Sequence, residues 1–144
     1  METILIVDDE KLIRWSLSQE LSKERYTTIT AETMREAVAK VHESFPELVI
    51  LDLRLPDGTG IEALKAIKKI HPAVKVIILT AVDKSAVAVQ AMKLGAYDYL
   101  TKPVRVDELK MVVEKVMENI RLERELHLYQ ERGARYDNAR IIST

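Results

Sequence analysis

The sequence contains no cysteine among its 144 residues. Disulfide bonds, thiolate nucleophiles and cysteine-ligated zinc sites are therefore excluded. The sequence also lacks an apolar run long enough to cross a membrane, and residues 1–3 lead directly into a short apolar segment, which leaves no room there for a secretory signal. We therefore expect a cytoplasmic protein.

An excess of basic charge is missing as well. The chain carries 22 Lys and Arg against 23 Asp and Glu, a formal net charge of -1. Because phosphate backbones and anionic lipids attract clustered basic side chains, we expect no direct nucleic-acid or membrane binding. Hydrophobic residues make up 47% of the chain and charged residues 31%, which is typical of a globular protein. The length suits one domain and a short appendage.

Short runs of apolar and β-branched residues predict five strands, and polar side chains follow four of them. The run at 48–53 is interrupted only by Asp52, and Pro56, Asp57, Gly58 and Gly60 break it soon afterwards. Asp52 is therefore expected where a buried strand ends. The predicted strands are 4–7, 26–30, 48–53, 74–79 and 97–100.

Segments with apolar residues at helical spacing alternate with these strands. They are 10–24, 33–44, 61–70, 85–94 and a long segment from Asp107 onward. Thr33 and Glu36 have the spacing of a capping box, and Gly95 is typical of a left-handed helix cap. Strands alternating with helices favour an α/β fold, the flavodoxin-like (βα)5 doubly wound parallel sheet with strand order 2-1-3-4-5 and an extended C-terminal helix.

Polar side chains at the predicted strand ends would meet in one crevice of such a sheet. They are Asp8, Asp9, Asp52, Thr80 and Lys102. Three neighbouring carboxylates repel one another unless a cation neutralises them, and oxygen ligands with open water positions suit Mg2+. An amine and a hydroxyl beside that ion would bind a phosphoryl group, so Asp52 is predicted to be a nucleophile that forms an acyl phosphate.

The motifs Asp8-Asp9, Asp52, Thr80-Ala81 and Lys102-Pro103 resemble those of the receiver domain of two-component response regulators. The resemblance covers residues 1 to about 120. It implies that Asp52 accepts a phosphoryl group from a histidine kinase, and that Lys102, Thr80 and the amide of Ala81 bind this group.

The same resemblance implies a metal site and a switch. Mg2+ would be bound by Asp9, Asp52 and the backbone carbonyl of Arg54, with Asp8 acting through water. Tyr99 matches an aromatic switch position coupled to Thr80. Pro103 would follow a cis peptide bond that aims Lys102, and the side chains of Arg54 and Val82 would overhang the site.

Two other classes share part of this pattern. Phosphatases of the haloacid-dehalogenase type also place a nucleophilic Asp at a strand end, but they need a second Asp two residues later, where this chain has Arg54. A flavin-binding module would need a phosphate-binding loop after the first strand, where this chain has Asp8-Asp9-Glu10. Both are weaker alternatives. His42, His71 and His127 are scattered and do not suggest ligands, and Trp15 is interpreted as a packing or contact residue.

The helical pattern continues beyond residue 120. Leu122, Leu126 and Tyr129 follow Asn119 at coiled-coil spacing, and Gly133 is expected to end the helix. We divide the chain into a receiver domain, 1–120, and a helical linker, 121–144. The linker and residues 7–14 resemble NtrC-class activators of sigma-54-dependent transcription, whose AAA+ ATPase and DNA-binding domains would lie outside this chain. A homodimer is expected through residues 84–120, helix 119–132, or both. A stand-alone receiver, or one attached to a winged-helix DNA-binding domain, is the alternative.

Overall fold

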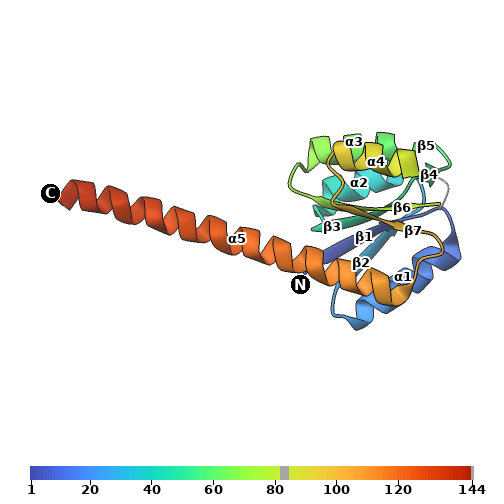
Figure 1. The fold of residues 1–144 in the computed structure, drawn as a ribbon, viewed down its shortest axis with the longest axis horizontal. Coiled ribbons are helices and arrows are strands. Elements are labelled where there is room, and N and C mark those ends of the chain that lie inside the picture. The colour runs from blue at the N-terminus through green and yellow to red at the C-terminus, as the bar shows by residue number, and fades with distance from the viewer. Residues whose placement is uncertain (82–84, 144) are drawn as a thin grey trace.

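The computed structural model describes residues 1–81 and 85–143, with side chains for 1–81 and 86–133. Strands and helices alternate along the chain (Figure 1). In order they are β1 (Thr3–Val7), α1 (Lys11–Lys23), β2 (Thr27–Ala31), α2 (Met34–Ser44), β3 (Leu48–Asp52), β4 (Arg54–Leu55), β5 (Gly58–Thr59), α3 (Gly60–Ile70), β6 (Lys75–Thr80), α4 (Ser85–Lys93), β7 (Asp98–Thr101) and α5 (Val106–Ser143).

The main sheet has five parallel strands in the order β2-β1-β3-β6-β7. Strands β4 and β5 form a separate two-stranded hairpin, which was not predicted. The main-sheet strands β6 and β7 are therefore the fourth and fifth predicted strands, and the observed order is the predicted 2-1-3-4-5. Helices α2, α3 and α4 cover one face of the sheet, and α1 and α5 cover the other (Figure 1). The flavodoxin-like fold is therefore confirmed.

Alternate residues of each central strand enter different cores. Leu5 and Val7 of β1 pack with α2 and α3, whereas Ile4 and Ile6 pack with α1 and α5. Every residue of β3 is buried, as expected for a strand covered on both faces. The strand backbones are thus held on both sides, and the positions of their carboxyl ends follow from this packing.

Local signals place the helix ends. The hydroxyl of Thr33 accepts a hydrogen bond of 3.0 Å from the amide of Glu36 and so caps α2. In a capping box the carboxylate of Glu36 would accept a hydrogen bond from the amide of Thr33. Here it accepts one from the amide of Glu32 instead. Gly95 has φ +104°, and its amide donates a hydrogen bond to the carbonyl of Met92 at the end of α4. This confirms the predicted left-handed cap.

The prediction that Gly133 ends the last helix is wrong. Helix α5 runs without a break to Ser143, and Gly133 does not have the positive φ of a left-handed cap. Glycine inside an exposed helix costs roughly 1 kcal/mol relative to alanine, which weakens a helix without stopping it. Figure 1 shows the resulting long helix leaving the sheet at the edge opposite the carboxyl ends of the strands.

Candidate functional site

The candidate site lies at the carboxyl ends of four neighbouring strands. Asp8 directly follows β1, Asp52 ends β3, Thr80 ends β6 and Lys102 directly follows β7. These strands are adjacent in the sheet, so their ends open onto one crevice. Asp8, Asp52 and Thr80 are the polar side chains buried there.

Lys102 joins the two buried carboxylates. Its ammonium lies 2.8 Å from Oδ2 of Asp52, to which it donates a hydrogen bond, and 3.0 Å from Oδ2 of Asp8. The other oxygen of each carboxylate accepts a hydrogen bond from the backbone amide two residues further along the chain. Arg54 donates to Asp52, and Glu10 donates to Asp8. The sequence prediction that these strand ends meet is therefore correct.

This arrangement leaves two buried negative charges with one positive charge between them. Burial raises the pKa of Asp8, the nearby charge of Asp52 adds to that effect, and the amide of Glu10 and the ammonium of Lys102 oppose it. Burial alone would lower the pKa of Lys102, but its contacts with Asp52 and Asp8 outweigh this effect and raise it. The site carries more negative charge than Lys102 can neutralise.

A cavity of about 310 Å³ opens at this edge. It is lined by Asp9, Glu10, Asp52, Leu53, Arg54, Thr80, Ala81 and Lys102. Asp8, Asp9 and Glu10 each offer a carboxylate oxygen within 4.8 Å of the others. In addition, Oδ2 of Asp8 is buried and accepts no hydrogen bond of good geometry, leaving only its ion pair with Lys102. This donor set of oxygens with excess negative charge fits a hard divalent cation.

The remaining predicted residues lie at the rim of the cavity or further away. Thr80 is buried, and its hydroxyl donates to the carbonyl of Ala81 at 3.3 Å. The Lys102–Pro103 peptide bond is cis, as predicted. Tyr99 is 43% exposed, so its side chain points to solvent. Val82 lies outside the described residues.

Two residues with no predicted role in the site support the strand ends. The guanidinium of Arg14 on α1 donates to the carbonyl of Asp8 at 2.7 Å and lies 3.5 Å from the carboxylate of Glu32. A Cβ on Gly60 would approach the carbonyl oxygen of Asp52 to 2.7 Å, so only glycine fits where α3 begins. No sequence spacing indicates Arg14, and the position of Gly60 shortly after Asp52 indicates only the end of a strand.

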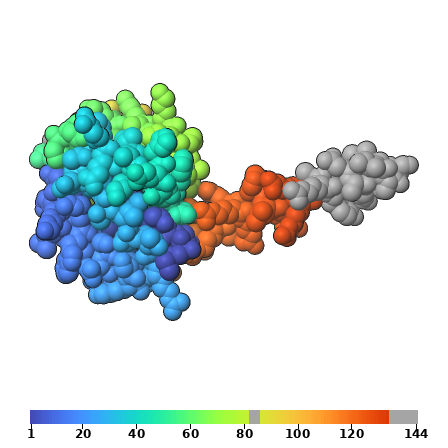
Figure 2. All heavy atoms as spheres, turned by 180° about the vertical axis from the view of Figure 1, so that it is seen from behind, coloured from blue at the N-terminus to red at the C-terminus, as the bar shows by residue number. Residues whose placement is uncertain are grey.

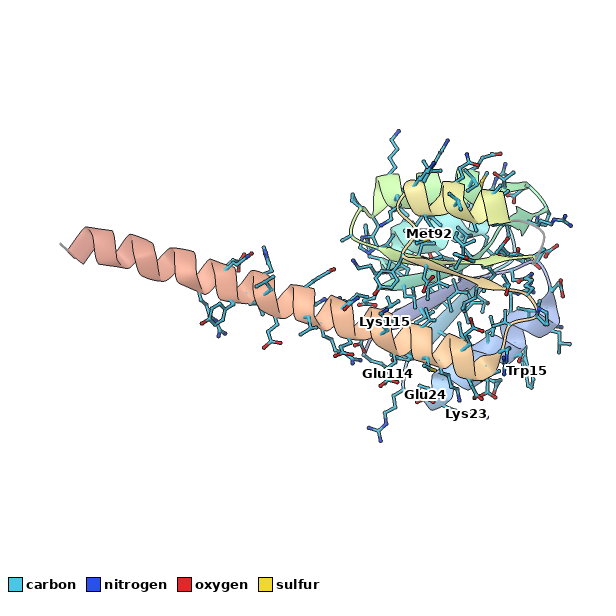
Figure 3. The ribbon with its side chains drawn as sticks, in the orientation of Figure 1. Trp15, Lys23, Glu24, Met92, Glu114 and Lys115 are labelled. Carbon is cyan, nitrogen blue, oxygen red and sulfur yellow. The ribbon has the colours of Figure 1, made fainter. Side chains whose placement is uncertain are left out.

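Residues outside the site behave as ordinary structural groups. His71 contacts the carbonyl of Pro46 at 3.1 Å, and His127 lies 3.1 Å from Glu131 on the exposed part of α5. Trp15 is 62% exposed on α1 (Figure 3), so it is a surface residue and not part of a core. Within the described residues no helix is both long enough and apolar enough to span a membrane.

Near residue 119, helix α5 is fastened to the opposite edge of the sheet. Asn119 donates to the hydroxyl of Tyr97, so the domain itself already contacts this first position of the predicted coiled-coil line. Leu122, Leu126 and Tyr129 are each more than half exposed. At about 100° of helix rotation per residue, Leu122 and Tyr129 lie on the side opposite the buried Ile120. Figure 2 shows this helix leaving the body beside the N-terminal residues.

Comparison with known protein families matches residues 4–114 to the response regulator receiver domain. Among curated proteins, the chain is 33% identical over 141 residues to the regulatory protein AtoC of Escherichia coli (strain K12), covering 97% of this chain and 31% of AtoC. It is 38% identical over 116 residues to sporulation initiation phosphotransferase F of Bacillus subtilis (strain 168), covering 81% of this chain and 94% of that protein.

Among solved structures, NtrX from Brucella abortus superimposes with a TM-score of 0.82 at 37% identity. The match covers 88% of this chain and 29% of NtrX. This chain therefore spans about a third of AtoC or NtrX, and nearly all of the phosphotransferase.

Proposed function

The chain belongs to the response regulator receiver domain family and matches the receiver part of larger NtrC-type regulators, and from this premise we propose that Asp52 is its phosphoacceptor. The observation that carries the proposal is the contact of one ammonium, Lys102, with the carboxylates of both Asp52 and Asp8 at the rim of the cavity. Such a pair presents a nucleophilic oxygen beside a cation that can stabilise transferred negative charge.

In the proposed reaction, a carboxylate oxygen of Asp52 attacks the phosphorus of a phosphohistidine on a histidine kinase. The new P–O bond replaces the P–N bond, and the kinase histidine leaves as a neutral imidazole after it takes up a proton. Lys102 then exchanges its contact with Asp52 for a phosphoryl oxygen, while Thr80 and the amide of Ala81 donate hydrogen bonds to the other oxygens.

Asp9, Asp52 and the backbone carbonyl of Arg54 would hold Mg2+, with Asp8 acting through water. When bound, this ion supplies positive charge to the phosphoryl oxygens, which the single ammonium of Lys102 cannot balance alone. The excess of carboxylates at this edge supports the assignment. The domain is therefore proposed to assist its own phosphorylation and dephosphorylation without acting as a conventional enzyme.

We further propose that phosphorylation regulates a sigma-54-dependent transcription activator. Thr80 and Tyr99 would couple the phosphoryl group to the surface formed by residues 84–120, and linker 121–144 would pass the change from the receiver, 1–120, toward AAA+ and DNA-binding domains. The outward-facing Leu122, Leu126 and Tyr129 support homodimer pairing through the linker helix. A stand-alone receiver is the second candidate, favoured by the nearly complete match to sporulation initiation phosphotransferase F.

The test is incubation of the protein with a small phosphodonor and Mg2+, read by intact-protein mass spectrometry. We expect one added phosphoryl group on wild type and none on Asp52→Asn, because the amide is not a nucleophile here. Light scattering with beryllofluoride, a mimic of the aspartyl phosphate, should show a change of assembly state in wild type alone. Equal labelling of both proteins would contradict the phosphoacceptor assignment, whereas correct labelling with unchanged mass would contradict only phosphorylation-driven association.

A further inference from the structure

The loop that follows Asp52 is tied to a distant helix through Asp57. One carboxylate oxygen of Asp57 accepts a hydrogen bond of 2.7 Å from the amide of Met34, and the other accepts one of 3.0 Å from the amide of Arg35. Both amides lie in the first turn of α2, where backbone N–H groups have no partner within the helix. These bonds lower the pKa of Asp57, with Arg35 contributing most and Met34 next.

Helix α2 does not need Asp57 merely to have a cap. Thr33 already caps it through the amide of Glu36, three residues along the same helix. Asp57 instead reaches α2 from a position 23 residues further along the chain. Its bonds therefore join two separate segments, whereas the bond of Thr33 is local.

The segment that Asp57 holds is the hairpin β4–β5. Its base is joined directly to the site, since the amide of Arg54 donates to Asp52 and the amide of Gly60 donates to the carbonyl of Leu53. Its strands have only two residues each, paired as Arg54 with Thr59 and Leu55 with Gly58. So short a ladder has little rigidity of its own.

The tip of this hairpin also packs closely on α2. A Cβ on Gly58 would lie 2.9 Å from Sδ of Met34, the residue whose amide binds Asp57. Polar and packing contacts thus fix the tip at one place. Because Arg54 is the first residue of the hairpin, a tilt of the tip would move the carbonyl of Arg54 relative to Asp52.

We propose that Asp57 is a positioning residue for the cation site: by holding residues 53–60 against α2, it keeps the carbonyl of Arg54 in place beside Asp52. This inference rests on the proposed function, in which that carbonyl binds Mg2+. Asp57 itself does not touch the cavity. Its loss should therefore weaken cation binding while the carboxylate donors stay intact.

The test compares Asp57→Ala with Thr33→Ala. Both variants remove hydrogen bonds from the start of α2, but only Asp57→Ala frees the hairpin. Mg2+ affinity is measured by isothermal titration calorimetry, urea unfolding without Mg2+ reports stability, and hydrogen-exchange mass spectrometry reports the mobility of residues 53–60. Asp57→Asn, which retains one acceptor oxygen, serves if the alanine variant does not fold.

We expect Asp57→Ala to bind Mg2+ about 5- to 10-fold more weakly than wild type, a loss of about one order of magnitude or 1.4 kcal/mol at most. Amide exchange over residues 53–60 should accelerate in this variant. Thr33→Ala should keep its Mg2+ affinity within about twofold although α2 loses its cap. Equal Mg2+ affinities for the two variants would show that Asp57 is only a second cap and would overturn the proposal.

Failure of the proposed function looks different. Absence of Mg2+ binding by wild type would contradict the metal site itself. Hydrogen exchange would still decide the role of Asp57 in that case: faster exchange over residues 53–60 in Asp57→Ala alone supports the anchor, and unchanged exchange overturns it.

Discussion

The two edges of the sheet use ion pairs in opposite ways. At the carboxyl edge, Lys102 pairs with Asp8 and Asp52, whose side chains are 0% and 7% exposed. At the amino edge, three pairs fasten residues 121–124 of α5 to the rest of the structure, and each has one partner more than half exposed. The pairs are Arg121 with Glu2, Glu123 with Lys75 and Arg124 with Glu47.

The buried pairs lie in the candidate site, whereas the exposed pairs attach α5 to the sheet. Charges taken out of water have a high desolvation cost, so the carboxyl edge stores unfavourable electrostatic energy that a cation or a phosphoryl group can change. Charges that remain in water interact weakly and are screened by salt. The amino edge therefore orients the exposed part of α5 at little cost, while the buried side chains of Met117 and Ile120 hold the helix against the sheet.

The largest effect should come from removing the shared cation of the carboxyl edge. Lys102→Met should lower the free energy of unfolding by about 2 kcal/mol at pH 7, because it leaves two buried carboxylates without their partner. Lys110→Met is the matched control, since Lys110 also contacts two carboxylates, Glu20 and Glu24, but at the surface. Lys110→Met should lower the free energy of unfolding far less than Lys102→Met does, because water screens its ion pairs. Equal losses in urea unfolding would show that burial does not distinguish the two sites.

A smaller effect of opposite sign is expected at Asp8. Asp8→Asn should raise the free energy of unfolding by about 1 kcal/mol at pH 7, because it removes one of two buried like charges and keeps an oxygen for the amide of Glu10. Burial raises the pKa of Asp8 in the folded state. Wild type is therefore relatively more stable below the unfolded-state pKa and loses that stability as pH rises through the raised folded-state pKa.

The advantage of Asp8→Asn should accordingly shrink as the pH is lowered, which urea unfolding across acidic and neutral pH can measure. Glu43→Gln, a change at an exposed carboxylate on α2, is the matched control. A constant difference between Asp8→Asn and wild type at every pH would mean that the ionisation of Asp8 is not the cause.

The smallest effects are expected at the amino edge. Arg121→Gln and Arg124→Gln should each lower the free energy of unfolding by less than about 0.5 kcal/mol. The loss should disappear at about 0.5 M NaCl, where the Debye length is only a few Å. The effect of Lys102→Met should survive the same salt, because that pair is largely shielded from solvent. Salt-resistant losses at Arg121 and Arg124 would place their pairs in the same class as Lys102.

The polar strand ends were predictable because they depend on short-range patterns, and the sheet order followed from the alternation of strands and helices together with the right-handed crossovers of parallel sheets. Apolar runs and helical spacing defined the alternation of strands and helices, and Asp8, Asp52, Thr80 and Lys102 stood at strand ends by position alone. The hairpin β4–β5 was not predictable, since its two-residue strands have no periodicity. The predicted end of the last helix at Gly133 was wrong because an exposed glycine weakens a helix without ending it.

The sequence by itself determined the fold class and the set of side chains that meet at the carboxyl edge, because buried parallel strands carry whatever follows them to one side of a sheet. Only the tertiary structure decided how those side chains are connected. The sharing of one ammonium by Asp8 and Asp52, the bond from Arg14 to the carbonyl of Asp8 and the anchor from Asp57 to α2 join residues at least 6 and up to 94 positions apart. Such contacts depend on the three-dimensional packing of whole elements, and no local pattern in the chain encodes them.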